Sequence, residues 1–156
     1  MNTTHRTQSR LKQNQGRPTA WIDAVAASKP PPEHYATTIV NRVRTAFEAL
    51  KNGTSDCAHF DRLAACINVG LIRSEAIDPL CEQTMKVAIV AMGNADAIYG
   101  RHRKYGFYGP DLQAVADAVD LYEEILRNST PHQMEDAVQE SARRMMEQAK
   151  QERQAA

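Results

Sequence analysis

A short run of cations, aromatic rings and glycines is the part of this sequence best suited to chemistry. It covers residues 100–109, Gly-Arg-His-Arg-Lys-Tyr-Gly-Phe-Tyr-Gly. Bases of single-stranded nucleic acid stack on aromatic rings while arginine and lysine follow the phosphates, and glycine lets the backbone approach a phosphate closely. The candidate residues for binding nucleic acid or another anion are therefore Arg101, His102, Arg103, Lys104, Tyr105, Phe107 and Tyr108.

The same run has a structural interpretation, which we favour. Cations stabilise the negative end of a helix, a glycine at 106 or 109 can end a helix or turn the chain, and the rings can pack beneath a bundle. The acidic face of the following predicted helix, with Asp117, Asp120 and Glu124, could also pair with these cations within the chain or in a dimer.

Metal binding is not predicted. Carboxylates and imidazoles lie one helical turn apart at Asp56–His59 and at His132–Glu135. A di-iron bundle uses Glu-x-x-His twice at mid-helix with two further glutamates, whereas these pairs have opposite order and stand at expected helix starts, where polar residues serve as caps. Cys57 and Cys66 have no zinc-type spacing with a pair of histidines. We expect neither a metal nor a cofactor.

Catalytic motifs are also missing from the sequence. There is no Gly-x-Ser-x-Gly elbow, and the glycines at 100–109 lack the strand-loop-helix context of a phosphate-binding loop. The clustered acids Asp120, Glu123 and Glu124 are typical of a solvated helix face. We therefore predict no catalytic residue.

The composition of the first 18 residues predicts a disordered basic arm. Arg6, Arg10, Lys12 and Arg17 are accompanied by one large apolar residue, Leu11. Such a segment buries too little apolar surface to offset the entropy lost on ordering.

Residues 19–32 combine a small apolar group with a stiff proline spacer. Trp21, Ile22 and Val25 have near-helical spacing and precede Pro30–Pro32. They either dock back on the core or anchor a partner. We favour docking, because the only tryptophan of the chain is costly to leave exposed.

The elements that would position these residues are helices. Apolar residues recur at spacings of three and four, and no segment alternates with period two between turn residues. The predicted helices begin near Glu33, at Ser55 or Asp56, and at Pro79, Pro110 and Pro131. Asp78 is the predicted cap of the third helix, and Thr130 and Gln133 have the spacing of a capping box at the start of the fifth. The second is expected to end near Gly70, and the third, apolar nearly all round its middle, is expected to be the central helix.

The predicted fold is therefore all-α, a single bundle of about five helices with a disordered basic N-terminal arm. Residues 33–130 form its core, and residues 131–156 form an amphipathic C-terminal helix that frays at its end. Met134, Val138 and Met145 make a thin apolar stripe on that helix and are the candidate residues for pairing in a homodimer.

Bulk composition limits the compartment and the partners. Nineteen basic and nineteen acidic residues give no net charge, which argues against a nucleic-acid packaging protein. Three cysteines without a Cys-x-x-Cys spacing fit a reducing compartment. The sequence has no apolar signal peptide and no run long enough to cross a membrane. We expect a cytoplasmic protein that has no membrane partner.

Three functional hypotheses remain. The favoured one is a non-enzymatic helical module for protein–protein interaction or regulation, with homodimerisation through residues 131–156 as one form. The alternative is a nucleic-acid-binding accessory protein that uses the basic arm and Arg101–Tyr108. An enzyme of unknown class is the least favoured.

Overall fold

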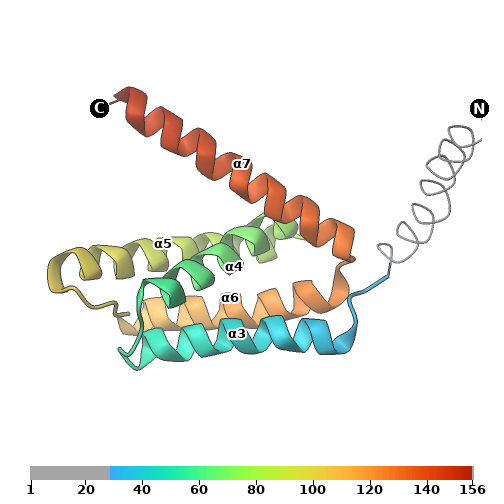
Figure 1. Ribbon diagram of the computed structural model, residues 1–156, viewed down its shortest axis with the longest axis horizontal. Coiled ribbons are helices and arrows are strands. Elements are labelled where there is room, and N and C mark those ends of the chain that lie inside the picture. Colours follow the sequence, from blue (N-terminus) through green and yellow to red (C-terminus); the bar gives the residue numbers. More distant parts are fainter. Residues whose placement is uncertain (1–28, 156) are drawn as a thin grey trace, which may run out of the picture.

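The structure is a computed structural model that describes residues 29–155. These residues form five helices and no strand: α3 (Glu33–Lys51), α4 (Cys57–Glu75), α5 (Pro79–His102), α6 (Gly109–Asn128) and α7 (Pro131–Ala155). The predicted all-α bundle is confirmed (Figure 1). The basic arm and the candidate anchor formed by Trp21, Ile22 and Val25 lie outside the described residues.

Local capping fixes where three of the helices begin. The Asp56 carboxylate accepts a hydrogen bond from the His59 amide at 2.9 Å, and the Asp56 amide donates to His59 Nδ1 at 3.3 Å. Asp78 caps α5 in a similar way, and Thr130 and Gln133 form the predicted reciprocal pair at the start of α7. Each cap satisfies amides that have no partner within their own helix. The capping role predicted for the Asp56–His59 pair is confirmed.

The central helix of the bundle is α4, which packs against α3, α5, α6 and α7. Its Leu63 and Ile67 are completely buried. The prediction that residues 79–102 form the central helix is wrong, because α5 leaves Val87 and Val90 exposed. The buried face of α5 is instead built mainly from small and flexible residues: Met85, Ala88, Ala91, Met92 and Ala95. Alanines on this face let the neighbouring helices approach closely. The other face of α5 is exposed, so α5 is less enclosed than α4 although its middle is more apolar.

Gly70 lies inside α4 and does not end it, contrary to the prediction. A Cβ atom at this position would lie 2.6 Å from Met85 Cε of α5 and 3.5 Å from Tyr122 Cδ2 of α6. A helical glycine costs about 1 kcal/mol relative to alanine. Here the missing side chain makes room for close packing of three helices, and α4 continues to Glu75.

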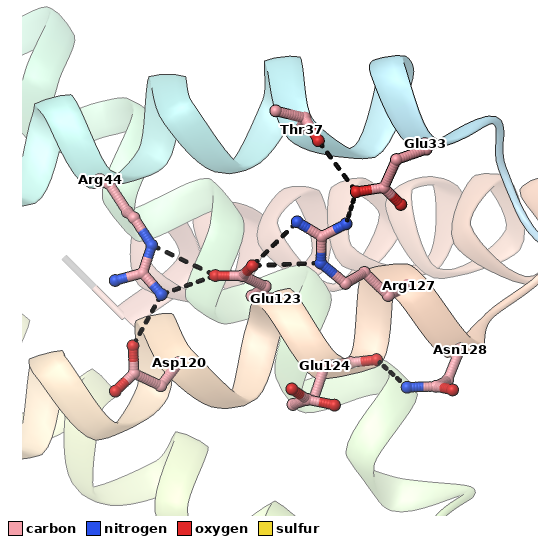
Figure 2. Close-up of polar contacts among 8 residues, drawn as sticks. All are labelled: Glu33, Thr37, Arg44, Asp120, Glu123, Glu124, Arg127 and Asn128. Atoms are coloured by element: carbon pink, nitrogen blue, oxygen red, sulfur yellow. Dashed lines mark hydrogen bonds and ion pairs between the residues drawn. The ribbon is translucent and has the colours of Figure 1, made fainter.

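Charged side chains join α3 to α6 in a row that Figure 2 shows. Arg44 Nη2 lies 2.6 Å from Glu123 Oε2 and 2.9 Å from Asp120 Oδ1. Arg127 Nη2 lies 2.9 Å from Glu123 Oε1, and Arg127 Nη1 lies 2.5 Å from Glu33 Oε1. The sequence left open that the acidic face of α6 pairs with the cations of residues 101–104, within the chain or in a dimer. Within the described residues its ion pairs go instead to α3 and to Arg127 of the same helix, because α3 and α6 pack side by side.

Glu123 should make this row sensitive to pH. Hydrogen bonds from Arg44, and then from Arg127, hold the pKa of Glu123 below its ordinary value. A depressed pKa contributes stability above the pKa of the unfolded chain, and this contribution is lost as the pH falls through the folded value. We expect Glu123→Gln to lower the free energy of unfolding by about 0.5–1 kcal/mol at neutral pH. The difference should shrink as the pH falls below about 4.

Urea denaturation at neutral and acidic pH measures this effect. The matched control is Glu124→Gln, since the Glu124 carboxylate makes no ion pair with any described residue. A gap between Glu123→Gln and wild type that stays the same at both pH values would contradict the prediction.

Candidate interaction surfaces

The basic-aromatic segment begins at the end of α5. Arg103 has a left-handed backbone (φ 56°), and its amide donates to the Tyr99 carbonyl at 2.7 Å. An arginine, and not Gly106 or Gly109 as expected, therefore makes the turn that ends the helix. Gly109 is the first residue of α6.

Tyr105 is the residue that anchors the segment to the bundle. Its ring stacks between Phe60 of α4 and Tyr99 of α5, with centroid distances of 4.5 and 4.4 Å. Its hydroxyl donates to Cys57 Sγ at 3.7 Å, and burial raises the pKa of the phenol. Tyr105 is only 6% exposed, so neither face of its ring is free for a nucleic-acid base.

The other two rings of the segment have different surroundings. Phe107 is half-buried and packs against the core, whereas Tyr108 is exposed. Tyr108 is therefore the most exposed ring of the segment, and Phe107 and Tyr105 line the same hollow as His102 and Lys104.

The cations of the segment form an exposed basic corner, which we define as Arg101, His102, Arg103, Lys104 and Lys51 of α3. Lys51, His102 and Lys104 line one shallow hollow. None of the cations from 101 to 104 makes an ion pair with a described residue. The corner is a concentrated positive patch on a protein of no net charge.

An apolar groove of about 550 Å³ lies between α3 and α7. Both helices pack on α4, and α3 also packs on α6, but α3 and α7 hardly touch each other. We call this feature the α3–α7 groove. Its lining comprises Pro31, Pro32, Tyr35, Ile39, Tyr122, Leu126, Pro131, Met134, Glu135 and Val138. A second hollow shares Ile39, Tyr122 and Val138 with it and extends over α4 to Arg42 and Arg62.

The chemistry of the α3–α7 groove favours binding through apolar contact. Among the described residues that line it, Glu135 is the only charged one. Tyr122 also lines the groove, and burial raises the pKa of its phenol. A site that orients a polar substrate has several polar groups pointing at one place. This lining instead offers rings, prolines and aliphatic side chains, which suit an apolar segment of polypeptide.

The C-terminal half of α7 is the third candidate surface. Only Ala137 and Ser141 of this helix are buried, and residues 142–155 are all exposed. Figure 1 shows α7 rising away from the other helices toward its C-terminal end. Of the candidate dimer residues, Met134 is half-buried in the α3–α7 groove, while Val138 and Met145 are exposed.

Ion pairs hold α7 together along its projecting part. Arg143 contacts Glu140 at 2.7 Å and Glu147 at 2.5 Å, and Arg144 contacts Glu140 at 2.8 Å and Glu75 of α4 at 2.6 Å. The two arginines lower the pKa of Glu140 to about 2. Pairs spaced by three or four residues stabilise a helix that has little packing. The helix extends to Ala155.

Two further kinds of site to consider are a metal centre and a membrane-spanning helix. No three His, Cys, Asp or Glu side chains of residues 29–155 cluster in a way that could hold a metal ion. No helix in this part of the chain is long and apolar enough to cross a bilayer.

Comparison with known proteins gives no family assignment. No protein-family model matches the chain, and neither a curated protein nor a solved structure matches it significantly.

Proposed function

We propose that this protein is a helical protein–protein interaction module whose α7 pairs with the α7 of a second copy. The observation that carries the proposal is the complete exposure of residues 142–155, which include Met145 and Met146. A helical stretch of this length without packing is marginally stable in water. Methionine side chains adapt well to a partner surface. A second helix would give this stretch the packing that the bundle does not provide.

The apolar stripe on α7 has the spacing of a helix-pairing face. Val138, Ala142, Met145 and Ala149 follow one another at steps of four, three and four residues. None of the four is buried in the bundle. From Ala142 onward the stripe lies where every residue of α7 is exposed, and there a second molecule can cover it.

Charge favours an antiparallel pair. Acidic residues predominate in the first half of α7 and basic residues in the second half. In an antiparallel pair, the acidic first half of α7 of one copy lies beside the basic second half of α7 of the other. Charges beside an apolar seam set the orientation of paired helices, and the two-fold axis makes the interface self-complementary. Two single helices bury less than a standard interface, so we expect a weak dimer.

Analytical ultracentrifugation tests the proposal. Wild type should show a mass that rises from monomer to dimer toward high micromolar concentration. Met145→Glu should hold the chain monomeric, because it puts a charge in the middle of the stripe. Gln151→Glu, on the opposite face of α7, adds the same charge and should leave the dimer intact. A wild-type chain that stays monomeric throughout would overturn the proposal.

The basic corner supports a second candidate function, an accessory role in binding nucleic acid. The side chains of residues 101–104 are exposed and make no ion pair with any described residue, whereas Lys51 pairs with Glu48 at 3.4 Å. Such cations gain affinity by releasing counterions from phosphates. The burial of Tyr105 weighs against base stacking, so we infer contact with the backbone and little sequence preference.

Salt dependence distinguishes this candidate. If the basic corner binds phosphates, replacing Arg101, Arg103 and Lys104 by Ala should reduce the slope of log affinity against log salt by up to about 3. Replacing Arg62, Lys86 and Lys150 by Ala removes the same charge elsewhere and should change the slope less. No salt-dependent binding of single- or double-stranded probes by wild type at low salt would overturn this candidate.

A further inference from the structure

The α3–α7 groove leaves apolar side chains open to water inside a protein that is otherwise well packed. Tyr35 and Val138 on its two walls are 52% and 53% exposed. Ile39 and Met134 are half-buried beside them. Contiguous apolar surface of this kind marks a site that another segment covers.

The N-terminal end of the described chain lies at this groove. Pro31 and Pro32 line it, and the first described residue, Lys29, precedes them by two positions. Val25 is six residues from Pro31 along the chain, a distance that an extended backbone spans with at most about 20 Å. Residues 21–25 can therefore reach the groove, and the prolines restrict the directions that the connecting chain can take.

The composition of the adjoining segment matches the groove. Trp21, Ile22 and Val25 are its large apolar residues, and their sequence spacing is near that of one face of a helix. Asp23 is the only charged residue between 19 and 28. The hollow that continues the groove over α4 is lined by Arg42 and Arg62, neither of which makes an ion pair with a described residue. The apolar residues of the segment thus match an apolar groove, and its one acid has the opposite charge to the two arginines beyond the groove.

We propose that the α3–α7 groove is the docking site of the chain's own segment Trp21–Val25. A short tether gives an intramolecular ligand an effective concentration in the millimolar range. The segment therefore competes strongly with any helix of a partner that would use the same groove, and such a partner must displace it. The groove is then a self-occupied site that meets the α7 stripe at Val138, whereas Ala142, Met145 and Ala149 of the stripe lie outside its lining and can pair while the segment is docked.

Fluorescence of the only tryptophan reports on this docking directly. We expect wild-type emission to be blue-shifted relative to the urea-unfolded chain and protected from acrylamide. Tyr35→Asp and Ile39→Asp each put a charge on the α3 wall and should shift the emission to the red and restore quenching. Tyr35 is half exposed, so Tyr35→Asp keeps the test valid if Ile39→Asp fails to fold. Val90→Asp, on the exposed face of α5, should leave emission and quenching unchanged.

Three results would overturn the docking proposal. The first is wild-type emission and quenching like those of the unfolded chain. The second is a blue shift that persists in groove variants whose circular dichroism shows a folded bundle. The third is emission that changes on dilution. Docking within one chain does not depend on concentration, whereas docking of the segment onto a second copy would weaken on dilution. Sedimentation of Tyr35→Asp separates the two proposals, because its dimerisation should match that of wild type whatever its tryptophan does.

Discussion

Tyr105→Ala is expected to destabilise the bundle by about 3–5 kcal/mol, the range for removing a buried aromatic side chain. Tyr105 is 6% exposed and lies between the rings of Phe60 and Tyr99. Its removal leaves a cavity and also ends two stacking contacts, each worth about 0.5–1.5 kcal/mol beyond the buried area. Chemical denaturation monitored by circular dichroism measures the change.

Two control variants locate the source of the effect. Tyr105→Phe keeps the stack and loses only the contact of the hydroxyl with Cys57 Sγ at 3.7 Å, so it should cost less than about 1 kcal/mol. Tyr108→Ala removes a ring from the same segment that is 64% exposed, and it should change stability by no more than about 0.5 kcal/mol. Equal effects of Tyr105→Ala and Tyr108→Ala would contradict the assignment of Tyr105 to the core.

The stack also explains how the basic corner keeps its shape. Arg103 adopts a left-handed backbone, and its guanidinium carbon lies 6.0 Å from the centroid of the Tyr99 ring. Lys104 passes over Gly53, where a Cβ atom would lie 2.7 Å from Lys104 Cε. Arg103 and Lys104 thus lie in a loop that Tyr105 anchors to the core, directly after the end of α5 at His102. A variant that loses this ring should therefore disperse the corner as well as weaken the fold.

Sequence patterns predicted those parts of the fold that depend on neighbouring residues. The caps at Asp56, Asp78 and Thr130 were predicted correctly because a cap is made within three residues. The role of Gly70 could not be predicted, since it depends on Met85, which approaches from another helix. The same limit applies to the pairing of Arg44 with Glu123, which is 79 positions away.

The candidate site was predicted only in part for the same reason. Met134 and Val138 stood out as apolar residues of a weakly apolar helix, which suggested a pairing face. Their place in the α3–α7 groove follows from how far α3 and α7 stand apart, and this distance is set by α4 and α6. An apolar stripe predicts that a helix face packs against another element. It does not show how much of that face stays exposed once the helices of its own bundle have packed.

A comparison of two substitutions tests which helix is central. Ile67→Ala in α4 should lower the free energy of unfolding by about 2–5 kcal/mol, because the side chain is fully buried in the helix that contacts the other four. Val90→Ala in α5 should be within about 0.5 kcal/mol of wild type, because Val90 is 64% exposed and alanine favours a helix more than valine does. Urea denaturation gives both values.

Hydrophobicity alone would give the opposite ranking, since α5 has the most apolar middle of the predicted helices. A cost for Val90→Ala as large as that for Ile67→Ala would contradict α4 as the centre.

The position of α4 matters beyond stability, because α7 packs on it through Ala137 and Ser141 and is tied to it by the ion pair of Arg144 with Glu75. Both proposed surfaces, the stripe on α7 and the α3–α7 groove, depend on α7 holding its angle to the bundle. Loss of packing around Ile67 should therefore weaken dimerisation and tryptophan docking together, whereas Val90→Ala should affect neither.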